Sequence, residues 1–256
     1  MAAGLPRSTE DQTVYDTSPQ EVADFFALSR SWEAFVAARE RAWPPSPRLR
    51  VRGRKALSQP SALLPHLFLV GMVAYLIGSF PTGVLLSRIW AGVDPRFVGS
   101  SHTGGLNVLR VTGKLWLAVL TALVDGAKGI IAVGVGGWLA PTPWALPVAG
   151  VMAAVGHCWS LYARFQGGMG LSTLGAILLF VQPVAILVVA GLWFVLYRAT
   201  RHSARAMLLA LFVIGPTLWL LGEPCPVVAL GVTGCLALIV RQSSDWHRDY
   251  ERERQE

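Results

Sequence analysis

The chain has 256 residues, of which 53% are hydrophobic and only 14% are charged. A soluble domain usually carries about a quarter of charged residues, so this composition excludes an ordinary soluble protein and indicates an integral membrane protein. The formal net charge is +7, but the cations flank apolar segments instead of forming one patch, which argues against nucleic-acid binding.

The first 60 residues differ from the rest of the chain. The N-terminus contains no apolar stretch of the kind that a cleavable signal peptide needs. Ser18, Pro19 and Glu21 form a capping-box arrangement, and apolar side chains then recur at helical spacing. This pattern predicts an amphipathic helix that lies on the membrane or docks on the rest of the protein. The arginines of the following linker suit anionic lipid headgroups.

From about residue 63 the chain is a series of apolar segments, and a membrane-spanning helix needs roughly 20 apolar residues. Seven segments are expected, at 64–88, 115–138, 143–160, 172–182, 184–198, 206–221 and 226–241. Merging the fourth and fifth across Pro183 into one kinked helix would give six. The expected fold is an all-α helical bundle in the membrane over residues 61–248, after an extension over residues 1–60 and before a charged tail over residues 249–256.

The distribution of Lys and Arg favours seven spans. In that arrangement the loop cations from Arg88 to Arg241 fall on one face, whereas the loops around Pro141, Pro183 and Glu223 contain no Lys or Arg. By the positive-inside rule the cationic face is cytoplasmic. The basic linker then falls on the opposite face; six spans would move it inside but scatter the other cations over both faces.

The three cysteines, Cys158, Cys225 and Cys235, lie in or beside apolar segments. Their odd number and the absence of a CxxC spacing favour packing residues over a disulfide framework or a metal site. No internal repeat is evident in the sequence, which weakens the interpretation as a small transporter of a phosphorylated solute.

Two glycine-rich stretches lie on the expected cytoplasmic face. They read VGSSHTGGLNVLRVTGK from Val98 and GHCWSLYARFQGGMGLST from Gly156. Irregular backbone at membrane level persists only where protein buries it or where it lines a watery cavity. Glycines let successive N–H groups converge on an anion, Ser100 and Asn107 add side-chain donors, and Arg110 suits bidentate binding of a phosphate. The pattern favours phosphate recognition over the alternative of ordinary loop glycines.

Charged side chains also occur inside the second apolar segment. Asp125 and Lys128 are spaced i, i+3, which puts them on one face of a helix. Charges inside a membrane are normally paired, so they form an ion pair that holds the bundle together or line the site directly. His157 has the same two interpretations, as a hydrogen-bonded core histidine or as a site residue.

These motifs resemble a known family. AYLIGSFPTGVLLSR, VGSSHTGGLNVLRVTGK, LVDGAKG and GHCWSLYARFQGGMGLST occur in the order found in the PlsY-type acyl-phosphate:glycerol-3-phosphate acyltransferases, over about residues 64–248. The resemblance implies a seven-span enzyme of phospholipid biosynthesis in the cell membrane, with its site facing the cytoplasm. It implies transfer of an acyl chain from acyl phosphate to the 1-hydroxyl of glycerol 3-phosphate, with no metal and no cofactor.

The motifs also give a set of expected site residues. Together with Lys128, the expected substrate-binding residues are Ser79, Gly99, Ser100, Gly104, Asn107, Arg110, Gly167, Gly168 and Gly170. The candidate catalytic residues are Ser100, Arg110 and His157, and the resemblance makes Ser100 and Arg110 phosphate contacts.

The chain departs from the family pattern in several places. Ser101, His102 and Leu106 replace glycine, asparagine and threonine of the second motif, and RQSSD stands in place of an RHxEN-like element. Gln166 and Met169 stand where the family has lysines, which removes charge-assisted contacts of about 1.5–3 kcal/mol each. An active acyltransferase is the first hypothesis, and a repurposed paralogue that binds lipid or a protein partner is the alternative.

Overall fold

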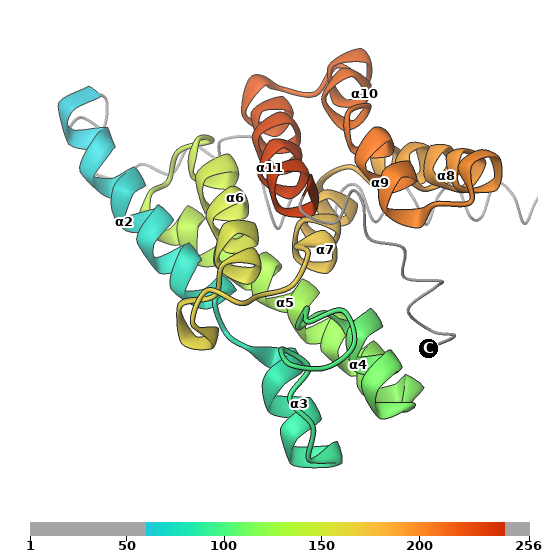
Figure 1. Cartoon of the computed structure of the whole chain (residues 1–256). Coiled ribbons are helices and arrows are strands. Elements are labelled where there is room, and N and C mark those ends of the chain that lie inside the picture. The colour runs from blue at the N-terminus through green and yellow to red at the C-terminus, as the bar shows by residue number, and fades with distance from the viewer. Residues whose placement is uncertain (1–59, 244–256) are drawn as a thin grey trace, which may run out of the picture. The chain divides into compact units, whose positions relative to one another are not determined.

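The computed structural model describes residues 60–243, which form helices joined by loops and contain no β-strand (Figure 1). The amphipathic helix and basic linker expected before residue 60, and the charged tail expected at the C-terminus, lie outside the described residues. The helices are α2 (Pro60–Gly78), α3 (Thr82–Ala91), α4 (Gly105–Thr112), α5 (Leu115–Leu139), α6 (Ala145–Cys158), the 3₁₀ turn η1 (Leu161–Ala163), α7 (Leu171–Val181), α8 (Pro183–Thr200), α9 (Ser203–Leu211), α10 (Ile214–Leu220) and α11 (Cys225–Ser243).

The expectation of an all-α membrane bundle is confirmed. Within the described residues, 6 helical segments are long and apolar enough to cross a membrane, namely Leu63–Ala91, Leu115–Leu139, Ala145–Ala163, Pro183–Thr200, Ser203–Leu220 and Cys225–Ser243. The apolar helix α7 is shorter, with 11 residues, so it is about 16 Å long, roughly half the thickness of the hydrocarbon core. A count of seven spans therefore remains a prediction.

Two expected segments are interrupted rather than continuous. The first, 64–88, breaks between Gly78 and Thr82, where Pro81 lacks the N–H that a continuous helix would use. The segment 206–221 breaks into α9 and α10. Pro183 instead starts α8, after an extended Gln182 (φ −148°, ψ 88°), so α7 and α8 are two helices and not one kinked helix.

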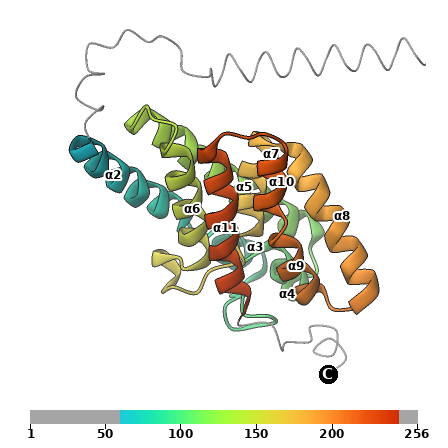
Figure 2. The same cartoon turned by 90° about the horizontal axis from the view of Figure 1, so that it is seen from above.

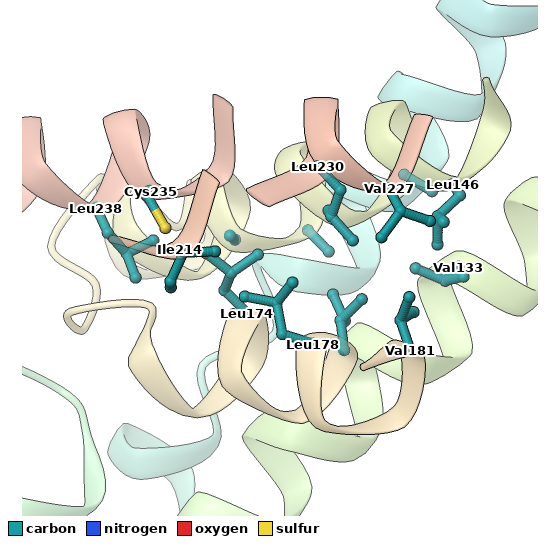
Figure 3. Close-up of a cluster of buried hydrophobic side chains, with 14 of the residues drawn as sticks. Val133, Leu146, Leu174, Leu178, Val181, Ile214, Val227, Leu230, Cys235 and Leu238 are labelled. Atoms are coloured by element: carbon teal, nitrogen blue, oxygen red, sulfur yellow. The ribbon is translucent and has the colours of Figure 1, made fainter. Parts of the chain in front are cut away.

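Helix α6 lies at the centre of the packing and contacts α2, α5 and α11, as both views show (Figures 1 and 2). α7 packs on α5, and α8 packs on α9. Buried aliphatic side chains of α5, α6, α7, α10 and α11 meet in one core (Figure 3). The labelled members of this core are Val133, Leu146, Leu174, Leu178, Val181, Ile214, Val227, Leu230, Cys235 and Leu238.

Tryptophans mark the two ends of α5. Trp90 and Trp116 form an edge-to-face pair with ring centroids 5.5 Å apart, and Trp138 near the other end is 82% exposed. At 1.5 Å per residue, Trp116 and Trp138 are about 33 Å apart along the helix, close to the ~30 Å of a hydrocarbon core whose borders attract tryptophan. The loop that follows α3 lies at the Trp116 end, because Lys114 Nζ donates to Trp90 O at 2.7 Å.

Candidate active site

The first loop, residues 92–104 between α3 and α4, is held by the amide of Asn107. Asn107 Oδ1 accepts from the backbone N–H of Ser100 at 2.8 Å. Its Nδ2 donates to the carbonyls of Pro95 at 2.8 Å, Val98 at 3.1 Å and His102 at 2.8 Å. Asn107, expected as a ligand contact, thus has both ends of its amide engaged in shaping this loop.

A charged brace closes the outer end of the first loop. The carboxylate of Asp94 contacts Arg96 Nη2 at 2.8 Å and Arg88 Nη2 at 2.5 Å. The side-chain hydrogen bonds from Arg96 hold the pKa of Asp94 at about 2, against the opposing effect of burial, and the same contact raises the pKa of Arg96. Arg96 Nη1 also donates to Ala163 O at 3.3 Å, which links the first loop to η1.

The second loop, residues 159–170 between α6 and α7, lies directly against His157. The N–H of Gly168 donates to His157 O at 3.1 Å. A side chain at Gly167 would overlap that carbonyl, and one at Gly168 would overlap His157 Nε2. Gly170 adopts φ +77° at the start of α7, a conformation that favours glycine.

A buried charge cluster lies beside the second loop. Asp125, Lys128 and His157 are 1%, 6% and 5% exposed. Lys128 Nζ lies 2.9 Å and His157 Nδ1 3.5 Å from Asp125 Oδ1, and these are charge contacts, since neither carboxylate oxygen accepts a hydrogen bond within the described residues. The expected i, i+3 ion pair is present, and Lys128 Nζ also donates to Phe80 O at 3.0 Å.

Arg241, in the last turn of α11, connects the two loops. Its Nε donates to Gly168 O at 3.1 Å, and its Nη2 donates to Gly167 O at 3.2 Å. The same Nη2 lies 3.1 Å from His102 Nδ1 in the first loop. The two glycine-rich stretches therefore meet in one site, as their shared chemistry required.

The two loops lie at different depths along α5. Gly105, at the start of α4, packs against the carbonyl of Ala118, near the beginning of α5. Thr173, in the first turn of α7, donates from Oγ1 to Asp125 O at 2.9 Å, about 15 Å along α5 from its first residue. The second loop therefore reaches α5 farther from the start of that helix than the first loop does.

The remaining expected residues lie in or near the two loops. Ser79 is fully buried after α2, its carbonyl accepts from Ser160 Oγ, and its own Oγ has no hydrogen-bond partner among the described residues. Gly99 (φ +65°) packs on Asn107. Gly104 caps α4, whereas Arg110 is exposed in the last turn of that helix and not in the loop itself.

The cradle of converging N–H groups expected from the loop glycines stays a prediction, although three N–H groups of the two loops already have acceptors within the protein. The N–H groups of Ser100, Ser101 and Gly168 donate to Asn107 Oδ1, Val98 O and His157 O. These three donors are used within the protein because backbone at membrane depth must satisfy its own hydrogen bonds. The glycines here allow close approach of backbone to backbone and to the His157 ring.

Three contributors to the site were not assigned a site role from the sequence, namely Arg96, Ser160 and Arg241, whereas Thr173 was expected as a residue of the family's third motif. Arg241 counted only as a topology cation, although it opens the RQSSD element that aligns with a family motif. Ser160 and Thr173 lie within the second glycine-rich stretch, but their partners are distant in the chain, Ser79 O directly after α2 and Asp125 O in α5.

An apolar groove runs from the surface to this cluster. It lies between the α2–α3 junction and α5, and Lys128 is one of its lining residues, together with Leu76, Phe80, Leu85, Val124 and Ile131. Its volume is about 770 Å³, within the roughly 300–1,000 Å³ of ligand pockets. An apolar groove with a cation in its lining suits a ligand that has an apolar tail and an anionic head.

Fold and site together define a class of protein, an integral membrane protein with a buried charge cluster beside an apolar groove. The family model described as "Glycerol-3-phosphate acyltransferase" matches residues 68–251. The chain belongs to this family, and the resemblance seen in its motifs is confirmed.

Individual relatives agree with this assignment. The chain is 37% identical over 185 residues to a glycerol-3-phosphate acyltransferase of Rubrobacter xylanophilus, covering 72% of this chain and 89% of the relative. It is 39% identical over 173 residues to that of Pseudomonas aeruginosa, covering 68% and 89%. Among solved structures, PlsY (YgiH), an integral membrane glycerol 3-phosphate acyltransferase in its glycerol 3-phosphate form, matches with a TM-score of 0.62 and 26% identity, covering 71% of this chain and 90% of that one.

Proposed function

We propose that this protein transfers an acyl chain from acyl phosphate to the 1-hydroxyl of glycerol 3-phosphate and releases phosphate, a step of phospholipid synthesis. Membership of a family whose members are named glycerol-3-phosphate acyltransferases supports the reaction class and the acceptor. The donor and the residue roles below are inferred from the site.

The observation that carries the proposal is that Lys128 lines the apolar groove and contacts the same Asp125 carboxylate as His157. An acyl chain in the groove brings its phosphate head to the buried ammonium. Gly168 lies at the same point, since a side chain at this position would overlap His157 Nε2.

In the proposed reaction the substrate hydroxyl oxygen attacks the acyl carbonyl carbon. The new ester C–O bond forms, the bond from the acyl carbon to the phosphate oxygen breaks, and the phosphate leaves. His157, held by Asp125 on its Nδ1 side, takes the hydroxyl proton at Nε2 and passes it to the leaving phosphate. Lys128 stabilises the negative charge that develops on the phosphate.

We place the site on the cytoplasmic side of the membrane. Arg96 and Arg164 lie in the first and second loops, Arg88 lies in the last turn of α3, and Lys114 lies between α4 and α5. Cytoplasmic loops carry an excess of such cations. Glycerol 3-phosphate, which is charged and water-soluble, would approach the site from that side. The acyl donor would enter from the bilayer through the groove.

The activity is tested with purified full-length protein in lipid nanodiscs, supplied with palmitoyl phosphate and glycerol 3-phosphate. We expect equal amounts of inorganic phosphate and lysophosphatidic acid, and no product from palmitoyl-CoA. His157→Gln should lower kcat/KM at least ~100-fold, because general base catalysis contributes about 10²–10⁴. Arg201→Gln, at an exposed arginine between α8 and α9, is the control. A folded protein that forms no product would overturn the proposal.

Lys128 needs a second design, because removing one member of a buried ion pair destabilises by about 3–5 kcal/mol. The double variant Asp125→Asn with Lys128→Met removes both charges together. We expect it to fold and to lose activity at least as strongly as His157→Gln. Full activity in this variant would exclude the ion pair from the reaction.

A further inference from the structure

Arg241 belongs to an element that otherwise packs away from the first loop. α11 contacts α6, α7, α9 and α10, yet the guanidinium of Arg241 lies within 3.1 to 3.2 Å of acceptors in both loops. Two of these acceptors are the consecutive carbonyls of Gly167 and Gly168, and the third is the His102 ring. One side chain thus contacts both the first loop and the second loop.

The chemistry of the contact fixes the His102 ring. A guanidinium has only donors, so His102 Nδ1 must accept, and the ring proton then resides on Nε2. The carbonyl of His102 is held separately by Asn107 Nδ2 at 2.8 Å. His102 is 8% exposed, so both its backbone and its ring are fixed within the packed loop.

We propose that Arg241 is a positioning residue. It holds the second loop against the first and sets the orientation and tautomer of His102, so that the two loops are preformed for a phosphorylated substrate. The inference rests on the proposed function. A planar fork that spans several acceptors is specific to arginine, since lysine presents a single point of charge.

The kinetic test compares Arg241→Gln and Arg241→Lys with wild type in nanodiscs. We expect both variants to raise the KM of a phosphorylated substrate at least tenfold while kcat changes less than threefold, since a preformed binding site is lost. Arg201→Gln is the matched control and should match wild type. Full recovery in Arg241→Lys would indicate a simple charge contact and would overturn the proposal, as would an unchanged KM in Arg241→Gln.

A second test does not depend on activity. Hydrogen exchange reports the amides of Ser100, Ser101 and Gly168, which donate to Asn107 Oδ1, Val98 O and His157 O. In Arg241→Gln we expect exchange at least tenfold faster in both loops, with α5 and α6 unchanged. Faster exchange confined to the end of α11 would sink the proposal. An inactive wild-type protein would overturn the proposed function alone, because the exchange result decides the fastening of the loops separately.

Discussion

The glycine backbone of the second loop packs closely against the His157 ring. Gly168 both donates its N–H to His157 O and lies against Nε2. The ring nitrogen that accepts the proton in the proposed reaction therefore lies directly against position 168, where a side chain would overlap it.

Replacing Gly168 with alanine tests this requirement. The methyl group would overlap His157 Nε2, so we expect kcat/KM to fall at least ~10-fold, a loss of about 1.4 kcal/mol or more in transition-state stabilisation. Gly191→Ala is the control, since Gly191 lies in α8 with no atom within 4 Å of the added methyl. Wild-type kinetics in Gly168→Ala would place the reaction elsewhere.

Asp94 makes the stability of the first loop depend on pH. Its pKa is lowered from 3.8 to about 2 by the Arg96 side chain. The carboxylate form is therefore the stabilising one, and its contribution is fully present above about pH 4 and is lost as the pH falls through about 2. Screening by solvent limits this contribution to about 1 kcal/mol.

Asp94→Asn should accordingly lower the free energy of unfolding by about 1 kcal/mol at pH 7. The difference from wild type should shrink below pH 4 and disappear near pH 2. Thermal unfolding of both proteins in the same detergent over this range is the measurement. A difference that stays constant down to pH 2 would show that the brace to Arg96 does not carry the effect.

At the scale of helices, the crossing of α2 and α6 fixes the entrance to the site. A side chain at Gly78 would overlap the carbonyl of Ala153, and one at Gly156 would overlap that of Tyr75. Small residues allow such close crossings of helices in membranes. Since Ser79 follows directly and accepts from Ser160, the crossing also determines where the second loop begins.

Gly78→Ala should therefore destabilise the bundle by about 1–3 kcal/mol, the usual effect of overpacking a closed contact. Gly71→Ala is a matched control on the same helix, because its methyl would meet Met152 Cγ at 3.4 Å and Val148 Cγ1 at 3.5 Å, both ordinary contacts. Unfolding midpoints in one detergent compare the two variants. Equal midpoints would mean that α2 and α6 separate easily, and the crossing would lose its structural role.

The helices were more predictable than the site. The bounds of α5 and α11 lie within a few residues of the expected segments, because long apolar runs fix them, and Asp125 with Lys128 followed from helical spacing. The contact of Arg241 with His102 joins residues 139 positions apart, and no local pattern encodes it. The amide of Asn107 was likewise assigned to a ligand, since sequence cannot show that the loop itself consumes it.

At the scale of the whole molecule, both loops and their cations gather at one end of the bundle. The Trp90–Trp116 pair lies at this end of α5, and Trp138 lies at the other. The loops around Pro141 and Glu223 contain no Lys or Arg. This polarity orients the protein, but the short α7 leaves the expected count of seven spans open to a direct test.

Labelling of single cysteines by a membrane-impermeant maleimide on spheroplasts distinguishes seven spans from six. Cys225 is exposed at the start of α11, whereas Cys158 and Cys235 are buried. With seven spans and a cytoplasmic site, we expect Cys225 to react on intact spheroplasts and Cys225→Ser to abolish the signal.

Two reporters in the Cys225→Ser background then locate the site. Gln166→Cys in the second loop and Ser203→Cys at the start of α9 are both at exposed positions. If α7 and α8 each cross the membrane, the two loops share a side, and both reporters should react only after permeabilisation. If the segment from α7 to α8 crosses only once, the reporters lie on opposite sides. Labelling of Gln166→Cys on intact spheroplasts would thus show that the second loop lies on the outer side of the membrane, away from cytoplasmic glycerol 3-phosphate.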